Sequence, residues 1–343
     1  MTSVSLDFQE ELSVMTDAVQ AEERSGQKQS NQVTVIPIRL DSPLSPEENY
    51  GNSGEFILSA IGRAGVEIEQ GDVIVVTSKI ISILENRCFK LEEVRPSLRA
   101  KLLGKVFGKS PNKVELILRE GPVSAVIPFK WVLKDKRISE RILGSSFNVS
   151  DSLKIIDTFK NVFVVKRYGI YLDEAGIDAS NLPEGWAGLL PVDSCRSARE
   201  IREVIESNLK KHVAVVITDT TSVLGRTGSI DIALGFSGID PIGREHARTD
   251  LFHRPKSGGM DVIVDSISAF AGSVMGGFTE CTPICVIKGL RYKRPDRSMG
   301  MSDLLYPPGV KTKSFLKALL PNLLLWFLLF VTLPFSVSKN SRS

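Results

Sequence analysis

Residues 71–79 read Gly71-Asp72-Val73-Ile74-Val75-Val76-Thr77-Ser78-Lys79. The apolar run at 73–76 follows a Gly-Asp turn, which predicts a strand buried on both faces of a sheet. Residues 55–66, just before it, space their apolar side chains at helical intervals. The run ends in two hydroxyls and an ammonium, groups that a core excludes. In α/β proteins functional groups gather at the carboxyl ends of strands, although a surface turn with a solvated lysine would read the same way.

Further short apolar runs alternate with helical patterns along the chain. Strands are expected at 33–38, where Pro37 favours a sheet edge, and at 114–118, 162–165, 213–217 and 284–287. Residues 199–209 form an amphipathic pattern that Asp193 or Ser194 would cap. The chain is therefore predicted to be an α/β protein of mixed α+β type.

Composition narrows the possible classes of protein. The 343 residues carry a net charge of +3, so no global basic field argues for binding nucleic acid. Four widely spaced cysteines cannot form a disulfide scaffold or a zinc-finger pattern. Three histidines show no paired metal-ligand spacing. A folded protein of a reducing compartment is expected.

The domain organisation follows from shifts in composition. Residues 1–32 are polar and without periodicity, which predicts a disordered tail with no secretory signal. Residues 33–297 form the main domain, in which about 121–160 fit the alternating pattern poorly and are interpreted as an inserted lobe. A basic linker is expected at 298–317 and a membrane anchor at 318–337.

The C-terminal segment has the composition of a transmembrane helix. No charged residue occurs from 318 to 338, and leucines occupy every face of the expected helix. Basic residues are more numerous before this segment than after it, so the positive-inside rule places the globular domain in the cytoplasm. A buried terminal helix, consistent with Pro321 and Pro334, is the alternative, as is a helix lying against the membrane.

Two further motifs combine strand ends or turns with polar side chains. Asp219 and Thr220 follow the predicted strand at 213–217, and Arg226 stands in a glycine-flanked turn. An aspartate with a neighbouring hydroxyl suits Mg²⁺ or Mn²⁺, and such an arginine suits phosphate. Asp178 and Asn181 lie in the turn at 175–181, which could also be a simple helix cap. No P-loop pattern occurs.

In this order the motifs resemble the coenzyme F420-0:L-glutamate ligase (γ-glutamyl ligase) family over about residues 33–292. The resemblance rests on GDVIVVTSKIIS, AGIDASN, LLPVDSCRSAREIRE, VITDT, RTGSIDIALG, VMGG and TPICVIKGL. It implies a γ-glutamyl-ligase-like fold without a P-loop and a homodimer. It also implies GTP, L-glutamate and a deazaflavin coenzyme acceptor as substrates, and Mg²⁺ or Mn²⁺ as cofactor.

The resemblance also implies roles for individual residues. Asp178, Asp219 and Thr220 would bind the metal. The residues that would contact the nucleotide or coenzyme are Ser78, Lys79, Thr220, Arg226 and Asn181. Two of them, Lys79 and Arg226, would also be catalytic. The reaction implied is phosphorylation of a carboxylate, followed by attack of the glutamate amine on the acyl phosphate to form an amide.

Three positions depart from the family pattern. Val223 stands where the family usually has an arginine, Tyr168 where it often has histidine, and Ser266 where it has an acidic residue. Two alternatives therefore stay open beside the ligase. The chain could be a diverged protein that binds nucleotide or coenzyme without ligation, or a membrane-tethered scaffold.

Overall fold

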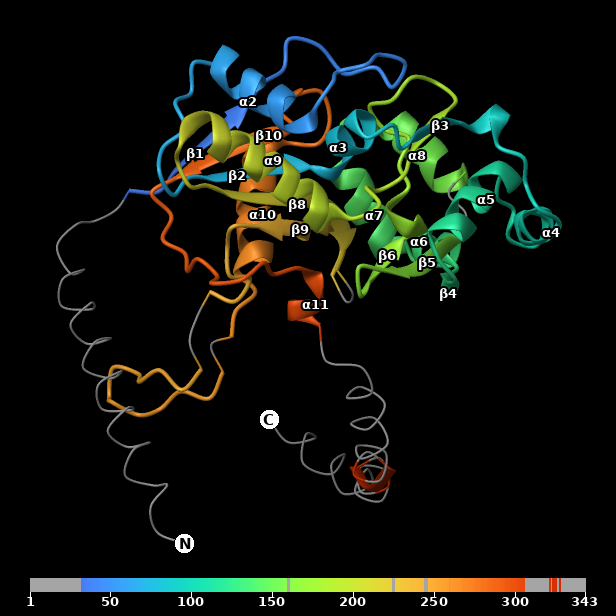
Figure 1. Cartoon of the computed structure of the whole chain (residues 1–343). Coiled ribbons are helices and arrows are strands. Elements are labelled where there is room, and N and C mark those ends of the chain that lie inside the picture. The colour runs from blue at the N-terminus through green and yellow to red at the C-terminus, as the bar shows by residue number, and fades with distance from the viewer. Residues whose placement is uncertain are drawn as a thin grey trace, which may run out of the picture.

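The computed structural model describes residues 32–305 except 159–160, 224–225, 244–245 and 259, together with positions 321, 323–325 and 327. Its centre is a five-stranded sheet in the order β1-β10-β2-β8-β9 (Figure 1). The strands are β1 (Thr34–Ile38), β2 (Val73–Thr77), β8 (Ala214–Ser222), β9 (Ser229–Ser237) and β10 (Ile284–Lys288). Only β2 and β8 run parallel, and the other pairs in the sheet are antiparallel. Pro37 lies in β1, at the sheet edge, as its missing N–H predicts.

Helices cover both faces of this sheet. Alternate residues of β2 point to opposite sides, so Ile74 and Val76 pack under α2 (Ser53–Arg63) and α9 (Ser194–Leu209). Val73 and Val75 contact the other layer, formed by α10 (Ile263–Met275). All four valine and isoleucine side chains are fully buried, which explains why β2 is apolar without alternation. The result is a mixed α/β sandwich.

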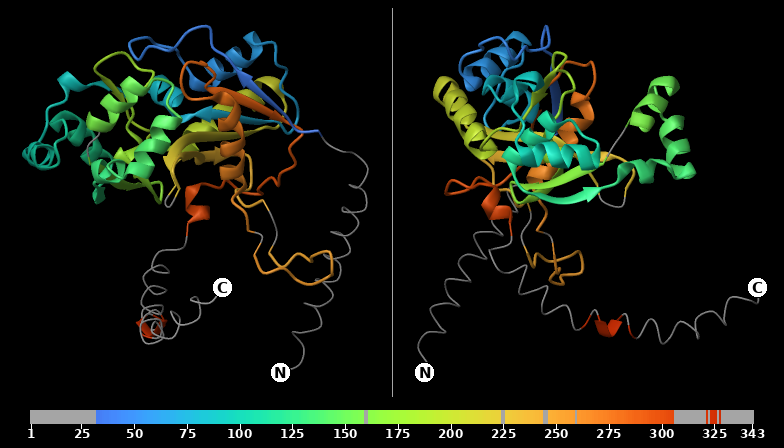
Figure 2. Two further views of the ribbon diagram at one scale, coloured as in Figure 1. Left: turned by 180° about the vertical axis from the view of Figure 1, so that it is seen from behind. Right: turned by 90° about the vertical axis from the view of Figure 1, so that its right-hand side faces the viewer.

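A second lobe is built on its own antiparallel sheet, in the order β4-β5-β6, and holds a separate apolar core around Phe163 (Figure 2). Its strands are β4 (Val123–Ile127), β5 (Val162–Arg167) and β6 (Ile170–Asp173). Its helices are α4 (Leu98–Phe107), α5 (Pro111–Glu120), α6 (Phe129–Leu133), α7 (Lys136–Gly144) and α8 (Val149–Thr158). Residues 121–160 thus supply β4 to this sheet and three helices that stand to one side of it.

The remaining elements are short. They are α3 (Ser78–Leu84), β3 (Cys88–Lys90), the 3-10 helices η1 (Leu91–Glu93) and η2 (Glu174–Gly176), β7 (Trp186–Gly188) and α11 (Met301–Leu304). β3 and β7 pair in a two-stranded sheet.

The strand predicted at 114–118 is wrong, because these residues lie within helix α5. Pro111 occupies the first turn of this helix, where its missing N–H costs nothing. Val114, Leu116 and Ile117 are buried while Glu115 and Arg119 form an i,i+4 ion pair. The short apolar run is therefore one face of an amphipathic helix, a pattern that five residues cannot distinguish from a strand.

The expected tail at 1–32 lies outside the described residues, except Gln32. The expected linker is described only to residue 305, and the expected anchor at 318–337 only at five positions. Within the described part of the chain, no helix combines the length and apolarity needed to cross a membrane.

Candidate functional site

A cavity of about 470 Å³ opens where the parallel strands β2 and β8 end. Register pairs Thr77 with Thr218, so the residues that follow, Ser78 and Asp219, lie side by side. Further walls come from the turn after η2 and from the segment after α10. The polar residues of the lining are Thr77, Ser78, Lys79, Asp173, Glu174, Asp178, Ser180, Asn181, Thr218, Asp219, Thr220, Asp231, Glu280 and Thr282.

Asp219 sits half-buried at the floor of this cavity. The Ser78 hydroxyl donates a hydrogen bond of 2.8 Å to its Oδ2, and the Thr220 N–H donates one of 2.8 Å to its Oδ1. Burial raises the pKa of Asp219 to about 6, against the opposing effect of the Ser78 and Thr220 hydrogen bonds and the Lys79 charge. A carboxyl group in a cavity whose pKa is raised by burial is typical of a functional site.

Lys79 joins the β2 end to the turn that carries Asp178. Its ammonium contacts the Asp178 carboxylate and donates hydrogen bonds to the Ser180 carbonyl oxygen at 2.6 Å and hydroxyl at 2.7 Å. Burial would raise the pKa of Asp178, but the Lys79 charge and the Lys79 and Ser180 hydrogen bonds outweigh burial and lower it. Asp178 is therefore a carboxylate at neutral pH, and its side chain is 52% exposed toward the cavity and solvent.

The turn before Asp178 is set by tight packing. Ala175 and Gly176 both have positive φ values, and a Cβ at Gly176 would lie 2.5 Å from the Leu190 side chain. Only glycine fits this position without moving Leu190. After this turn, Asp178 forms an isolated β-bridge with Gly188 of β7, and this bridge fixes the position of the Asp178 backbone.

The sequence analysis assigned no role to Asp231, which also lines the cavity. The register of the β8-β9 hairpin places Asp231 opposite Thr220, whose hydroxyl donates a 2.5 Å hydrogen bond to its Oδ1. Its Oδ2 lies where a Cβ on Gly272 would be. Glu280 was likewise given no part in the site, whereas the pair Gly276-Gly277, which also lines the cavity, belongs to the VMGG motif of the resemblance. Asp231 could have been found by treating 214–237 as a β-hairpin, because antiparallel pairing of its two strands places residue 231 opposite Thr220.

The cavity is strongly acidic. Six of the described lining residues are carboxylic acids, Asp173, Glu174, Asp178, Asp219, Asp231 and Glu280, and the one basic lining residue is Lys79. Glu174 is turned toward Lys109 and Lys113 on the other side of the wall. Within the described part of the chain no three acidic, histidine or cysteine side chains stand close enough to hold a metal unaided.

The structure separates one predicted residue from the others. Ser78, Lys79, Asp178, Asn181, Asp219 and Thr220 all line the cavity. Arg226 is exposed in the β8-β9 connection and is absent from the lining, although the resemblance implies contact with phosphate there. Its backbone N–H donates a hydrogen bond of 3.1 Å to the Val223 carbonyl oxygen within the same turn.

The three departures from the family pattern also lie away from the described lining. Val223 stands at the start of the hairpin turn, and Ser266 is exposed on α10. Tyr168 occupies the β5-β6 turn and lines a different hollow with Cys195 and Arg199. None of these substitutions removes a described group from the cavity wall.

The raised pKa of Asp219 predicts a pH-dependent stability of the metal-free protein. Because the folded-state pKa lies above the unfolded one, the associated stability is present at low pH and lost as pH rises through about 6. Asp219→Asn removes this loss. The variant should therefore match the wild type near pH 4 and exceed its unfolding free energy by at most about 3 kcal/mol above pH 7. Urea unfolding with chelator between pH 4 and pH 7 measures the difference in unfolding free energy between the variant and the wild type. A difference that does not change with pH would contradict the raised pKa of Asp219.

Residues 51–289 match the family described as F420-0:Gamma-glutamyl ligase. The chain is 30% identical over 252 residues to the coenzyme F420:L-glutamate ligase of Methanothermobacter thermautotrophicus, covering 74% of this chain and 88% of the relative. It is 34% identical over 233 residues to that of Archaeoglobus fulgidus, covering 68% and 81%. With that of Methanopyrus kandleri the identity is 29% over 257 residues, covering 75% and 87%. The matched residues contain every wall of the cavity except the segment at 40–44. The chain therefore belongs to the F420-0:gamma-glutamyl ligase family.

Proposed function

We propose that this protein is a GTP-dependent ligase that joins L-glutamate to coenzyme F420-0 through an amide bond. The acceptor carboxylate attacks the γ-phosphorus of GTP, the bond to the β-phosphate oxygen breaks, and GDP leaves. The glutamate amine then attacks the acyl carbon, loses a proton and displaces inorganic phosphate. The observation that carries this proposal is the pairing of Lys79 with Asp178 beside Asp219 in one cavity of a chain from this family.

Lys79 is the group that meets the transferred phosphoryl in this proposal. Its ammonium is held by Asp178 and by two oxygens of Ser180, so its position is fixed before substrate binds. A positioned cation is worth more in a partly closed cavity than in water, because solvent screens it less. Ser78 and Thr220 keep the Asp219 carboxylate oriented through hydrogen bonds to both of its oxygens. Asn181, in the same turn as Asp178, offers an amide to the nucleotide.

The acidic lining fits a metal that arrives with the nucleotide. A triphosphate alone would be repelled by carboxylates that outnumber the single ammonium. Mg²⁺ is commonly held by one or two carboxylates together with substrate phosphates, and Asp178 and Asp219 supply that number. Bound there with Thr220 nearby, Mg²⁺ or Mn²⁺ would neutralise phosphate charge during transfer.

Three further parts of the proposal concern assembly and location. The protein acts as a homodimer, and its segment at 318–337 anchors it in a membrane with the catalytic domain on the cytoplasmic side. The uncharged sequence of that segment and the basic residues before it support the anchor.

The alternative of a non-catalytic binder has less support. The three positions that depart from the family pattern, Tyr168, Val223 and Ser266, lie outside the described cavity wall.

A single incubation tests the activity. Purified full chain is mixed with F420-0, L-glutamate, GTP and Mn²⁺, and the coenzyme is analysed by mass spectrometry. We expect a mass increase of one or more glutamyl units that requires both GTP and metal. Metal-dependent binding of GTP with no mass increase would instead establish the non-catalytic binder.

Truncation after Lys313 tests the anchor. The full chain should sediment with membranes, and the truncated chain should stay in the supernatant with an unchanged thermal midpoint. The midpoint is preserved because the described cores contain no residue beyond Leu304. A full chain that stays in the supernatant, and unfolds at lower temperature once truncated, would make the segment a core helix.

A further inference from the structure

Helix α4 uses one of its faces to hold the second lobe together. Ala100 and Gly104 are buried on this face, which packs against α5. A Cβ on Gly104 would come within 2.8 Å of the Lys109 carbonyl oxygen in the connecting turn and within 3.3 Å of Pro111 Cα in α5, so the two helices are in close contact. Ser97 caps the helix by accepting a hydrogen bond from the Ala100 N–H. These contacts fix the orientation of the helix, so its opposite face is exposed to solvent.

The outer face of α4 is apolar. Leu98, Leu102 and Val106 are 83%, 63% and 64% exposed, respectively. Because they are spaced four residues apart, they follow one side of the helix as a continuous stripe. The apolar residues of α4 that serve the core, among them Leu103 and Phe107, lie on the other side. The stripe therefore contributes nothing to the packing of this chain, and its exposure costs solubility.

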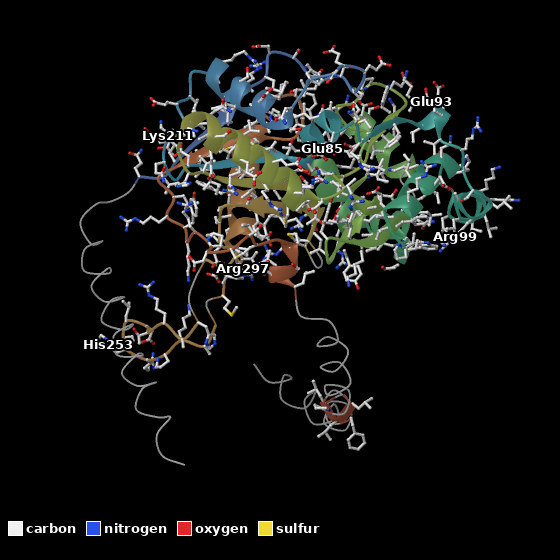
Figure 3. The ribbon with its side chains drawn as sticks, in the orientation of Figure 1. Glu85, Glu93, Arg99, Lys211, His253 and Arg297 are labelled. Atoms are coloured by element: carbon white, nitrogen blue, oxygen red, sulfur yellow. The ribbon has the colours of Figure 1, made fainter. Side chains whose placement is uncertain are left out.

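Four cations surround this stripe. Arg95 precedes the helix, Arg99 follows Leu98 on one side, and Lys101 and Lys105 precede Leu102 and Val106 on the other. All four are exposed, and none has an ion-pair partner among the described residues. No acidic residue occurs from 94 to 114. Figure 3 shows Arg99 at the outer end of the second lobe, well away from Glu85 and from the core of the main lobe.

We propose that this face of α4 is a docking surface for a lipid bilayer with anionic headgroups. A helix with an exposed apolar stripe and a basic border lies in the plane of the membrane interface. There the stripe enters the acyl boundary and the cations meet lipid phosphates and carboxylates. This assignment concerns where the protein works and stands independently of the reaction it performs.

The charge pattern favours a membrane over a second copy of the chain. In a two-fold dimer built on this face, the four cations would oppose the same four cations of the second copy. The Glu115 carboxylate at the start of α4 is already engaged, because it accepts hydrogen bonds from the Ser97 N–H and hydroxyl and pairs with Arg119. An anionic bilayer neutralises all four cations at once. The chain also carries the uncharged segment at 318–338, and stable membrane attachment generally takes two such signals. From residue 305 to residue 318 the chain can span at most about 45 Å, which allows both signals to reach one surface.

The test measures the full chain on vesicles of phosphatidylcholine alone and of phosphatidylcholine mixed with phosphatidylserine. The quantity compared is the ratio of the two partition coefficients, in which any charge-independent binding through the 318–338 segment cancels. The charge variant is Arg99→Gln/Lys101→Gln/Lys105→Gln. Its matched control is Arg63→Gln/Lys136→Gln/Lys166→Gln. This control removes three exposed cations that lie outside α4, and it has the same net charge as the charge variant. Circular dichroism spectra and thermal midpoints equal to those of the wild type verify that each variant is folded.

We expect the charge variant to lose its preference for anionic vesicles by roughly a hundredfold, because each cation near the surface contributes about fivefold. The matched control should lose much less. A stripe variant, Leu98→Ser/Leu102→Ser/Val106→Ser, should bind anionic vesicles roughly tenfold or more weakly while staying monodisperse in the same state as the wild type. Equal losses in the charge variant and its control would overturn the proposal, since net charge alone would then act. So would a change of oligomeric state in the stripe variant, which would assign the face to a second copy.

Discussion

Replacing Lys79 by methionine should lower kcat/KM for glutamate addition by roughly 100- to 1,000-fold, while the thermal midpoint changes little. Methionine retains much of the aliphatic length but loses the charge and the three hydrogen-bond donors. Lys79 is the one basic side chain among the described residues that line the cavity, so no neighbour can replace it. Loss of one positioned donor to a developing negative charge commonly costs this much in rate.

Two controls separate the charge of Lys79 from its surroundings. Lys90→Met removes a partly buried lysine that pairs with Glu47 outside the cavity, and it should leave kcat/KM unchanged. Ser180→Ala removes a hydroxyl that holds the Lys79 ammonium but leaves the charge, so a smaller loss of about tenfold is expected. If Lys79→Met and Lys90→Met have the same activity, Lys79 does not meet the phosphoryl group.

Much of the central sheet could be predicted because its strands are buried on both faces. Val73 to Val76 and Val213 to Ile217 are continuous apolar runs, and such runs have few stable alternatives. Their parallel pairing then brings the following residues to the same sheet edge. Ser78 and Asp219, 141 positions apart in the chain, meet there for this reason. The polar residues after each run were therefore informative about the site.

The rest depended on contacts that local pattern does not encode. The run at 114–118 is helical because it packs with α4 and the β5 sheet, and five residues do not show the helical period. Asp231 enters the cavity through hairpin register, and Glu280 through the connection after α10. Arg226 looked like a phosphate ligand by its glycine neighbours, yet a turn beyond the end of β8 carries it away from the described lining.

The acidic cavity makes the effect of one substitution on GTP binding depend in sign on whether metal is present. Without metal, carboxylates repel the triphosphate, so Asp219→Asn should tighten GTP binding severalfold in the presence of chelator. With Mn²⁺, the same variant lacks one of the two proposed metal carboxylates and should bind GTP at least about a hundredfold more weakly than the wild type. Asp178→Asn should behave likewise, except that it also frees Lys79 from its partner.

Calorimetric titration of GTP, with Mn²⁺ and with chelator, measures both arms on each variant. Asp151→Asn, which removes an exposed carboxylate on α8, is the matched control and should behave as the wild type in both arms. Because Asp219→Asn also relieves a buried charge, the variant should be as stable as the wild type or more so above pH 7, and a weaker affinity cannot then be attributed to unfolding. Tighter binding in both arms would mean that Asp219 acts on the nucleotide through its charge alone, and the metal would have to be held elsewhere in the cavity.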